Sequence, residues 1–436
     1  MNLTSEQTLW SVATDSGQDM TVLVGSTQKL QLTCNVGSLY PYIEWVVDVP
    51  PSYIEAGLLI VGSKLIFTFN EEKLATQIVV AAQIDSFQYV SMNVDTSAAS
   101  TVVFKMSTPY KFLDEVECKA YYGNVREILE TVCNEELIPC GAISALKVVK
   151  GIDTPMKRFR TYQTTKEFIE TRLADSYRGE EETYSYIFTD LSNTMYAYHT
   201  QGALTELPIY YCFHEGNHNL AYLAELSKIK TAAPFISMMQ GLAIYVNEKG
   251  TLWQAANAGI SMLYRTNTPK KLHDFPVFRM FPPMDIEQNE MLPITASKSK
   301  DYSSLTKVYI MDDQNDYSKE YTALSTLRNE ELFSALRIEV VTDMNLNINA
   351  GHICKLFPPS FKATAPILAS IFEGNWLISE VSHILQGTKG KTHLTLQATS
   401  LTQRGNRDYD ARFYRQEDNT DNKFSRDLTL ALAGLK

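Results

Sequence analysis

The chain has 436 residues, of which 44% are hydrophobic and 11% aromatic, and its formal net charge is −11. This composition supports packed cores and excludes global disorder, and the length predicts two to four domains. The negative charge argues against stable binding of nucleic acid through its phosphates, because the densest basic stretch is the short Lys157–Arg160.

The sequence carries no sign of export, membrane insertion or metal binding. The first twenty residues lack the basic segment and apolar stretch of a signal peptide, and no run approaches the ~18 apolar residues of a membrane helix, so no stable membrane insertion is expected. The six cysteines form no Cys-x-x-Cys pair. They favour buried or half-buried reduced thiols in a reducing cytosol, and no metal or cofactor is predicted.

Residues 1–110 are assigned to a first barrel domain, with strands predicted over 20–106. Every second residue of 29–36 is apolar, which is the pattern of a strand with one buried face, and Leu65, Phe67 and Phe69 repeat it. Residues 77–84 and 101–106 are also rich in β-forming residues, and glycines and prolines separate the segments. This region predicts one small antiparallel barrel or sandwich.

Two helices with the same start signal are predicted within residues 111–216. Asn124 with Glu127, and Thr164 with Glu167, each match a capping box ahead of an apolar stripe. A strand pair, 184–188 and 194–198, follows. We interpret 111–216 as an intervening domain of helices and strands.

A second barrel domain is assigned to residues 217–250 and 330–401, with 251–329 as an insertion. A helix is expected over about 220–229, and strands at 242–246 and 336–341. The last two strands of the domain alternate in hydrophobicity and flank a turn containing Gly387 and Gly390. In the first of them, Leu377, Val381 and Leu385 share one face and Trp376, Ile378 and Ile384 the other. Trp376 and Leu394 are predicted to be buried.

Residues 402–436 are assigned to a C-terminal tail. It is polar at first and ends in an apolar tip with Leu428, Leu430, Leu432 and Leu435. A polar tether with an apolar tip predicts docking on a partner, and a frayed terminus is the alternative.

One motif suggests chemistry. His214, Glu215 and His218 match the His-Glu-x-x-His zinc-peptidase pattern, which requires both histidines on one helical face. The intervening Gly216 and Asn217 disfavour a helix, so a solvated loop is the favoured interpretation. The histidines of the final strands, His383 and His393, are interpreted as strand-face polar groups rather than ligands.

The order of these parts resembles the baseplate hub proteins of contractile-tailed bacteriophages, the T-even-like tail hub family. The likeness is carried by residues 123–130, by 162–169 and most firmly by 345–403. The last stretch contains an Asn-Leu-x-Ile-x-x-Gly turn, a Trp-x-Ile-x-Glu-Val-x-His strand and a Thr-His-Leu-Thr-Leu strand. The turn has Ala350–Gly351 where Pro-Gly is usual, and it keeps the glycine that the backbone needs.

The resemblance implies an α+β, mostly β fold, with two tail-tube-like antiparallel β-barrels and small intervening α/β parts. It implies a homotrimeric hub without enzymatic activity, assembled in the host cytoplasm and located in the virion tail baseplate. Such a hub adapts the six-fold tail tube to the three-fold central spike and surrounds a channel for genomic DNA. Implied partners are the spike, the tail tube or distal tail protein, and the surrounding wedge proteins. The alternative is a tail-associated zinc peptidase or cell-wall hydrolase that uses His214, Glu215 and His218.

Overall fold

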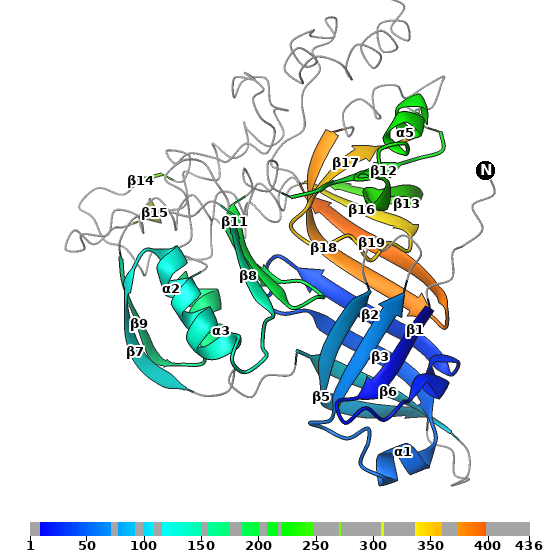
Figure 1. Cartoon of the computed structure of the whole chain (residues 1–436). Coiled ribbons are helices and arrows are strands. Elements are labelled where there is room, and N and C mark those ends of the chain that lie inside the picture. The colour runs from blue at the N-terminus through cyan, green and yellow to red at the C-terminus, as the bar shows by residue number, and fades with distance from the viewer. Residues whose placement is uncertain are drawn as a thin grey trace, which may run out of the picture.

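The computed structural model shows two barrels with a layered α/β part at their side (Figure 1). The residues that the structure describes are 9–70, 77–91, 99–108, 116–149, 156–173, 185–199, 207–216, 220–246, 270–271, 307–308, 336–359 and 374–397.

The first barrel consists of six antiparallel strands in the order β1-β4-β5-β6-β3-β2. The bounds are β1 (Leu9–Thr14), β2 (Thr27–Asn35), β3 (Tyr42–Val49), β4 (Lys64–Asn70), β5 (Ile78–Ser91) and β6 (Ser100–Ser107), with the short helices η1 (Thr21–Val24) and α1 (Pro51–Glu55). Alternate residues face a core in which Trp45 packs against Phe67 and Phe104. Among the described strands no ladder joins β1 to β2, so this barrel is open along that seam.

The second barrel is a closed ring of six strands in the order β18-β17-β12-β13-β16-β19, with β19 paired back onto β18. The bounds are β12 (Ile209–Phe213), β13 (Ile236–Val246), β16 (Leu336–Asp343), β17 (Ile353–Phe357), β18 (Gly374–Gln386) and β19 (Lys389–Gln397). It differs from a purely antiparallel barrel because β12 runs parallel to both neighbours. β12 lies before residue 217, within the range that the sequence assigned to the intervening domain. Because it pairs with β13 and β17, we assign it to this barrel.

The final hairpin forms as predicted, with β18 and β19 joined by a turn in which Gly387 adopts a φ of 59°. Trp376 and Leu394 are buried, which confirms that prediction. A bulge between Ile378 and Glu380 shifts the strict alternation of β18. Leu377 and Ile378 lie before the bulge on opposite faces, as the sequence pattern placed them, and both are fully buried, so both faces of β18 are covered at this point.

The intervening part contains two small sheets and two short helices. β8 (Ala145–Val149), β10 (Ser185–Thr189) and β11 (Thr194–His199) form a three-stranded sheet, and β7 (Glu117–Gly123) and β9 (Met156–Gln163) form a two-stranded ribbon. α2 (Val125–Val132) continues into the π-helical turn η3 (Cys133–Leu137), and α3 (Thr165–Phe168) into η4 (Ile169–Leu173). Both capping boxes predicted at Asn124 and Thr164 are formed.

These elements stack in layers. Tyr186 and Phe188 of β10 join the core of the barrels, whereas Ile187 and Met195 on the other face of the sheet pack with α2 and α3. Tyr121 of β7 then stacks on Phe168 of α3 with ring centroids 5.1 Å apart. The ribbon is therefore the layer farthest from the barrels, with the helices between (Figure 1).

The remaining described elements are α5 (Leu220–Leu226), η6 (Ala233–Phe235), β14 (Lys270–Lys271) and β15 (Lys307–Val308). The helix expected over 220–229 thus ends at Leu226. None of the described helices is long and apolar enough to cross a membrane.

Candidate functional site

The two barrels are joined by a ladder between β2 of the first and β18 of the second. Six residue pairs run from Asn35↔Glu380 to Leu30↔Leu385, and they turn both barrels into one continuous 12-stranded sheet. On the inner side, Cys34 and Leu32 share a single hydrophobic core with Val381 and Leu385. The barrels are therefore fixed to each other by backbone hydrogen bonds and by a common core.

The outward side chains of β3, β2, β18, β19 and β16 are mostly polar, and we call the surface that they form the junction face. Across β2 and β18, Gln31 Nε2 donates to Ser382 Oγ at 2.9 Å and Asn35 Nδ2 donates to Glu380 Oε2 at 3.0 Å. Towards β3, Lys29 Nζ lies 2.9 Å from Glu44 Oε1. These cross-strand contacts hold the polar side chains in a fixed pattern over both barrels.

The same rows continue beyond the junction, because residues opposite one another in a ladder share a face. Glu380 lies opposite Thr395, which lies opposite Glu339, and Arg337 Nη2 pairs with Glu339 Oε1 at 2.6 Å. Carboxylates on this face are hydrogen-bonded or paired, and uncharged polar groups lie between them. Such a surface is suited to an ordered interface or to a wall that does not retain phosphates.

A buried polar group supports the second barrel from inside. His383 is fully buried, and its Nε2 donates to the carbonyl of Ile348 at 3.3 Å while Nδ1 accepts from the Thr392 hydroxyl at 3.0 Å. Burial lowers the pKa of His383 to about 4, so the imidazole is neutral. His383 is thus a polar group on a strand face, as interpreted from the sequence, and after the bulge in β18 that face points inward.

The partner of His383 is the Asn-Leu-x-Ile-x-x-Gly turn that the sequence singled out. Asn345, which has no exposed surface, donates through Nδ2 to the Pro234 carbonyl at 2.9 Å, and Ile348 is equally buried. Gly351 closes the turn with a φ of 81°. The turn therefore packs into the barrel, and its glycine is required by the left-handed backbone.

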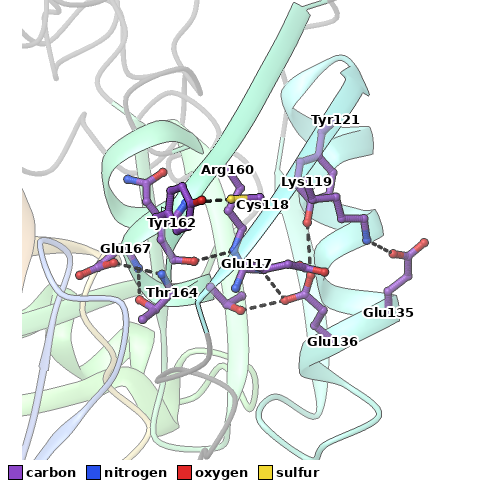
Figure 2. A network of polar contacts seen from close by, with 12 residues as sticks. Glu117, Cys118, Lys119, Tyr121, Glu135, Glu136, Arg160, Tyr162, Thr164 and Glu167 are labelled. Atoms are coloured by element: carbon purple, nitrogen blue, oxygen red, sulfur yellow. Dashed lines mark hydrogen bonds and ion pairs between the residues drawn. The ribbon is translucent and has the colours of Figure 1, made fainter.

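A second polar cluster surrounds Arg160, whose side chain is only 2% exposed (Figure 2). Its Nη1 lies 2.9 Å from Glu136 Oε2 and 3.2 Å from Glu117 Oε2. Thr165 Oγ1 and Tyr121 OH also donate to the Glu136 carboxylate, at 2.8 and 3.2 Å. The cluster ties the ribbon to both helices, and the π-helical turn carries Glu136.

The basic stretch Lys157–Arg160 does not form a nucleic-acid patch. Arg158 and Arg160 are two residues apart on β9, so both lie on its inner face, where they are 5% and 3% exposed. Alternation along β9 predicts that the two share a face, but it does not say which face is inside. This is why the sequence alone did not single out Arg160.

The segment that matches the zinc-peptidase pattern begins in a turn after β12. His214 Nδ1 accepts from the Gly216 N–H at 2.9 Å, and the next helix starts only at Leu220. His218 lies outside the described residues, as do Leu428, Leu430, Leu432 and Leu435. In the part of the chain that the structure covers, no three or more His, Cys, Asp or Glu side chains are grouped to hold a metal ion.

The cysteines are all free thiols. Cys34, Cys133, Cys212 and Cys354 are buried and Cys140 is intermediate, as expected, whereas Cys118 is exposed on β7.

The fold is similar to that of solved tail proteins. It matches the crystal structure of the tail protein from Neisseria meningitidis MC58 with a TM-score of 0.50 and 8% identity, over 90% of this chain and 96% of that one. No protein-family model and no curated protein sequence matches.

Two further solved structures are similar at 9% identity. The 43 kDa tail protein of prophage MuSo2 from Shewanella oneidensis has a TM-score of 0.49, over 91% of this chain and 98% of that one. An Escherichia coli type VI secretion component, described as similar to two T4 bacteriophage tail proteins, has 0.47, over 89% and 76%. At these identities the likeness to the Neisseria tail protein shows the fold. It confirms at that level the predicted resemblance to tail hub proteins and the predicted mostly β class.

Proposed function

We propose that this chain is a structural component of a phage tail, the trimeric hub of its baseplate. The observation that carries the proposal is the β2–β18 ladder, which makes two tube-like barrels one rigid sheet with one continuous outer face. Three such chains supply six barrel units related by three-fold symmetry. That number lets a ring meet a six-fold tube on one side and a three-fold spike on the other.

The junction face supports a further part of the proposal, a channel through which genomic DNA passes. DNA is retained by unpaired Lys and Arg side chains that displace its counterions. On the junction face Lys29 is engaged by Glu44 and Arg337 by Glu339, and the whole chain is acidic. A wall of this kind lets DNA slide without binding it. We propose that the chain acts in the virion through such interfaces and not as a catalyst.

The oligomeric state tests the hub proposal. Light scattering of the purified chain is expected to give the mass of three copies, and electron microscopy is expected to show rings with a central opening. A chain that stays monomeric at micromolar concentration, alone and with its spike protein, would refute the hub.

The channel has its own test. Exchanging Glu44 and Glu380 for lysine together should leave the trimer intact but create salt-sensitive DNA binding and slow DNA release. The matched control exchanges Glu130 of α2 and the exposed Glu225 of α5, which lie on helices and not on the strands of the junction face, for lysine. Equal DNA affinity of both variants would argue against a channel wall at the junction face.

A further inference from the structure

The outer side of the β7–β9 ribbon exposes aromatic side chains. Strand alternation turns Tyr121 and Arg160 inward onto the helices and leaves Cys118, Ala120, Tyr122 and Phe159 on the outside. Ala120 lies directly opposite Phe159 in the ladder. With Tyr162 at the end of β9, these residues define what we call the ribbon face.

Tyr162 is held in an unfavourable backbone conformation. Its φ is 49°, a left-handed value that is energetically unfavourable for any residue with a β-carbon. Its side chain is 80% exposed. Two hydrogen bonds support this conformation: Arg160 Nε donates to the Gln163 carbonyl at 2.8 Å, and the Tyr162 N–H donates to Cys118 Sγ at 3.4 Å (Figure 2). Strain of this kind persists at binding sites, where it presents a side chain to a ligand.

The size of the ribbon face limits what can cover it. Tyr122, Phe159 and Tyr162 are 66, 59 and 80% exposed. At about 150–250 Å² for each aromatic side chain, they offer roughly 300–500 Å². A stable dimer buries about 800 Å² on each partner. The face is therefore too small to hold two copies together by itself.

We propose that the ribbon face binds an apolar surface of a different protein in the assembled tail. Phe159 and Tyr162 are the anchors, and Arg160 is the positioning residue beneath them. The inference rests on the proposed tail function. It fits the place of the ribbon as the layer farthest from the barrels (Figure 1). The buried position of Arg158 and Arg160 leaves no guanidinium on this face for phosphates.

Cys118 provides a built-in probe, because it is the exposed cysteine among the six. The measurement is the rate of maleimide labelling of Cys118, in the purified chain and in purified tails. We expect rapid labelling of the purified chain and at least about tenfold slower labelling in tails. A Cys118 that is already protected in the purified oligomer would mean that a second copy covers the face. Equal rates in chain and tails, or protection of the purified chain by phosphatidylglycerol vesicles, would also overturn the proposal.

Two variants separate binding from folding. Phe159→Ser is expected to lower the amount of chain recovered in tails by about thirtyfold, the effect of losing one interface anchor. Tyr162→Gly should lower it similarly while its thermal midpoint stays at or above that of the wild type, because glycine relieves the left-handed backbone. The control is Val22→Ser, a change at a 73% exposed residue of the first barrel. Wild-type recovery of both ribbon variants would refute the inference alone, whereas absence of the wild-type chain from tails would refute the tail function itself.

Discussion

Arg160 shows how one residue organises a region far from the barrels. Its guanidinium is almost wholly buried, and it holds the Glu136 carboxylate, which in turn accepts from Thr165 and Tyr121. Removing one partner of a buried ion pair leaves the other charge without compensation. The position of the ribbon against the helices therefore depends on this single cation.

We predict that Arg160→Met lowers the free energy of unfolding by about 3–5 kcal/mol. Chemical denaturation monitored by fluorescence measures it. The matched control is Arg126→Met, which breaks an exposed pair with Glu130, 2.8 Å apart, and should cost no more than about 0.5 kcal/mol. Equal costs for the two variants would contradict a role for burial.

The histidine pair of the zinc-peptidase motif gives a second prediction at this scale. Replacing His214 and His218 together by alanine should leave assembly and infectivity unchanged, because His214 lies in a turn and its Nδ1 accepts from Gly216. Metal analysis and plaque counts are the measurements. Loss of a bound zinc ion together with loss of infectivity would favour the peptidase.

At the scale of elements, the second barrel depends on polar groups inside it. His383 supports the Asn345–Gly351 turn from within, and His352 at the end of that turn is also buried. Burial lowers the pKa of each imidazole to about 4, with a smaller contribution from Lys147 at His352. Both are neutral in the folded protein but titrate near 6.5 when it unfolds.

We predict that the barrel loses stability as the pH falls through this window. Below about pH 6.5 the unfolded chain binds protons that the folded chain does not, so stability falls until about pH 4, by ~3 kcal/mol for each histidine. Urea unfolding at pH 7 and pH 5 measures the slope. His383→Gln, which can still donate to Ile348, should flatten it. A slope unchanged by this substitution would mean that His383 does not contribute.

At the scale of the whole molecule, β13 and β19 end, and β16 begins, at the same end of the second barrel. Val246 pairs with Leu336, and Arg337 with Gln397, so residues 247–335 and the C-terminal tail leave from the same end. The opposite end carries the β18–β19 turn, where the carbonyl of Gly387 accepts from Trp10 of the first barrel at 2.8 Å. The described part of the chain thus ends at Gln397, at the end of the barrel away from the β18–β19 turn.

We predict that deleting residues 427–436 leaves folding and trimer formation unchanged but weakens attachment to a partner. Burying Leu428, Leu430, Leu432 and Leu435 contributes roughly 6–10 kcal/mol, about half of which remains after ordering costs. Thermal melting, light scattering and recovery in tails measure the three properties. Wild-type recovery would show that the tip is only a frayed end.

Local sequence determined the elements of this protein. The alternation of residues 29–36, the capping boxes at Asn124 and Thr164, and the final hairpin all act within a few residues, so their patterns are legible in one dimension. The resemblance carried by residues 345–403 then gave the two-barrel class.

The tertiary structure decided how these elements meet. The β2–β18 ladder joins residues some 350 positions apart in the chain, as in Asn35 and Glu380, and no local pattern specifies which edge strands pair. Burial of His383 and Arg160 depends on a bulge and on the face of a ribbon, and a shift of one residue reverses inside and outside. The junction face, the buried cluster and the ribbon face are therefore products of long-range packing.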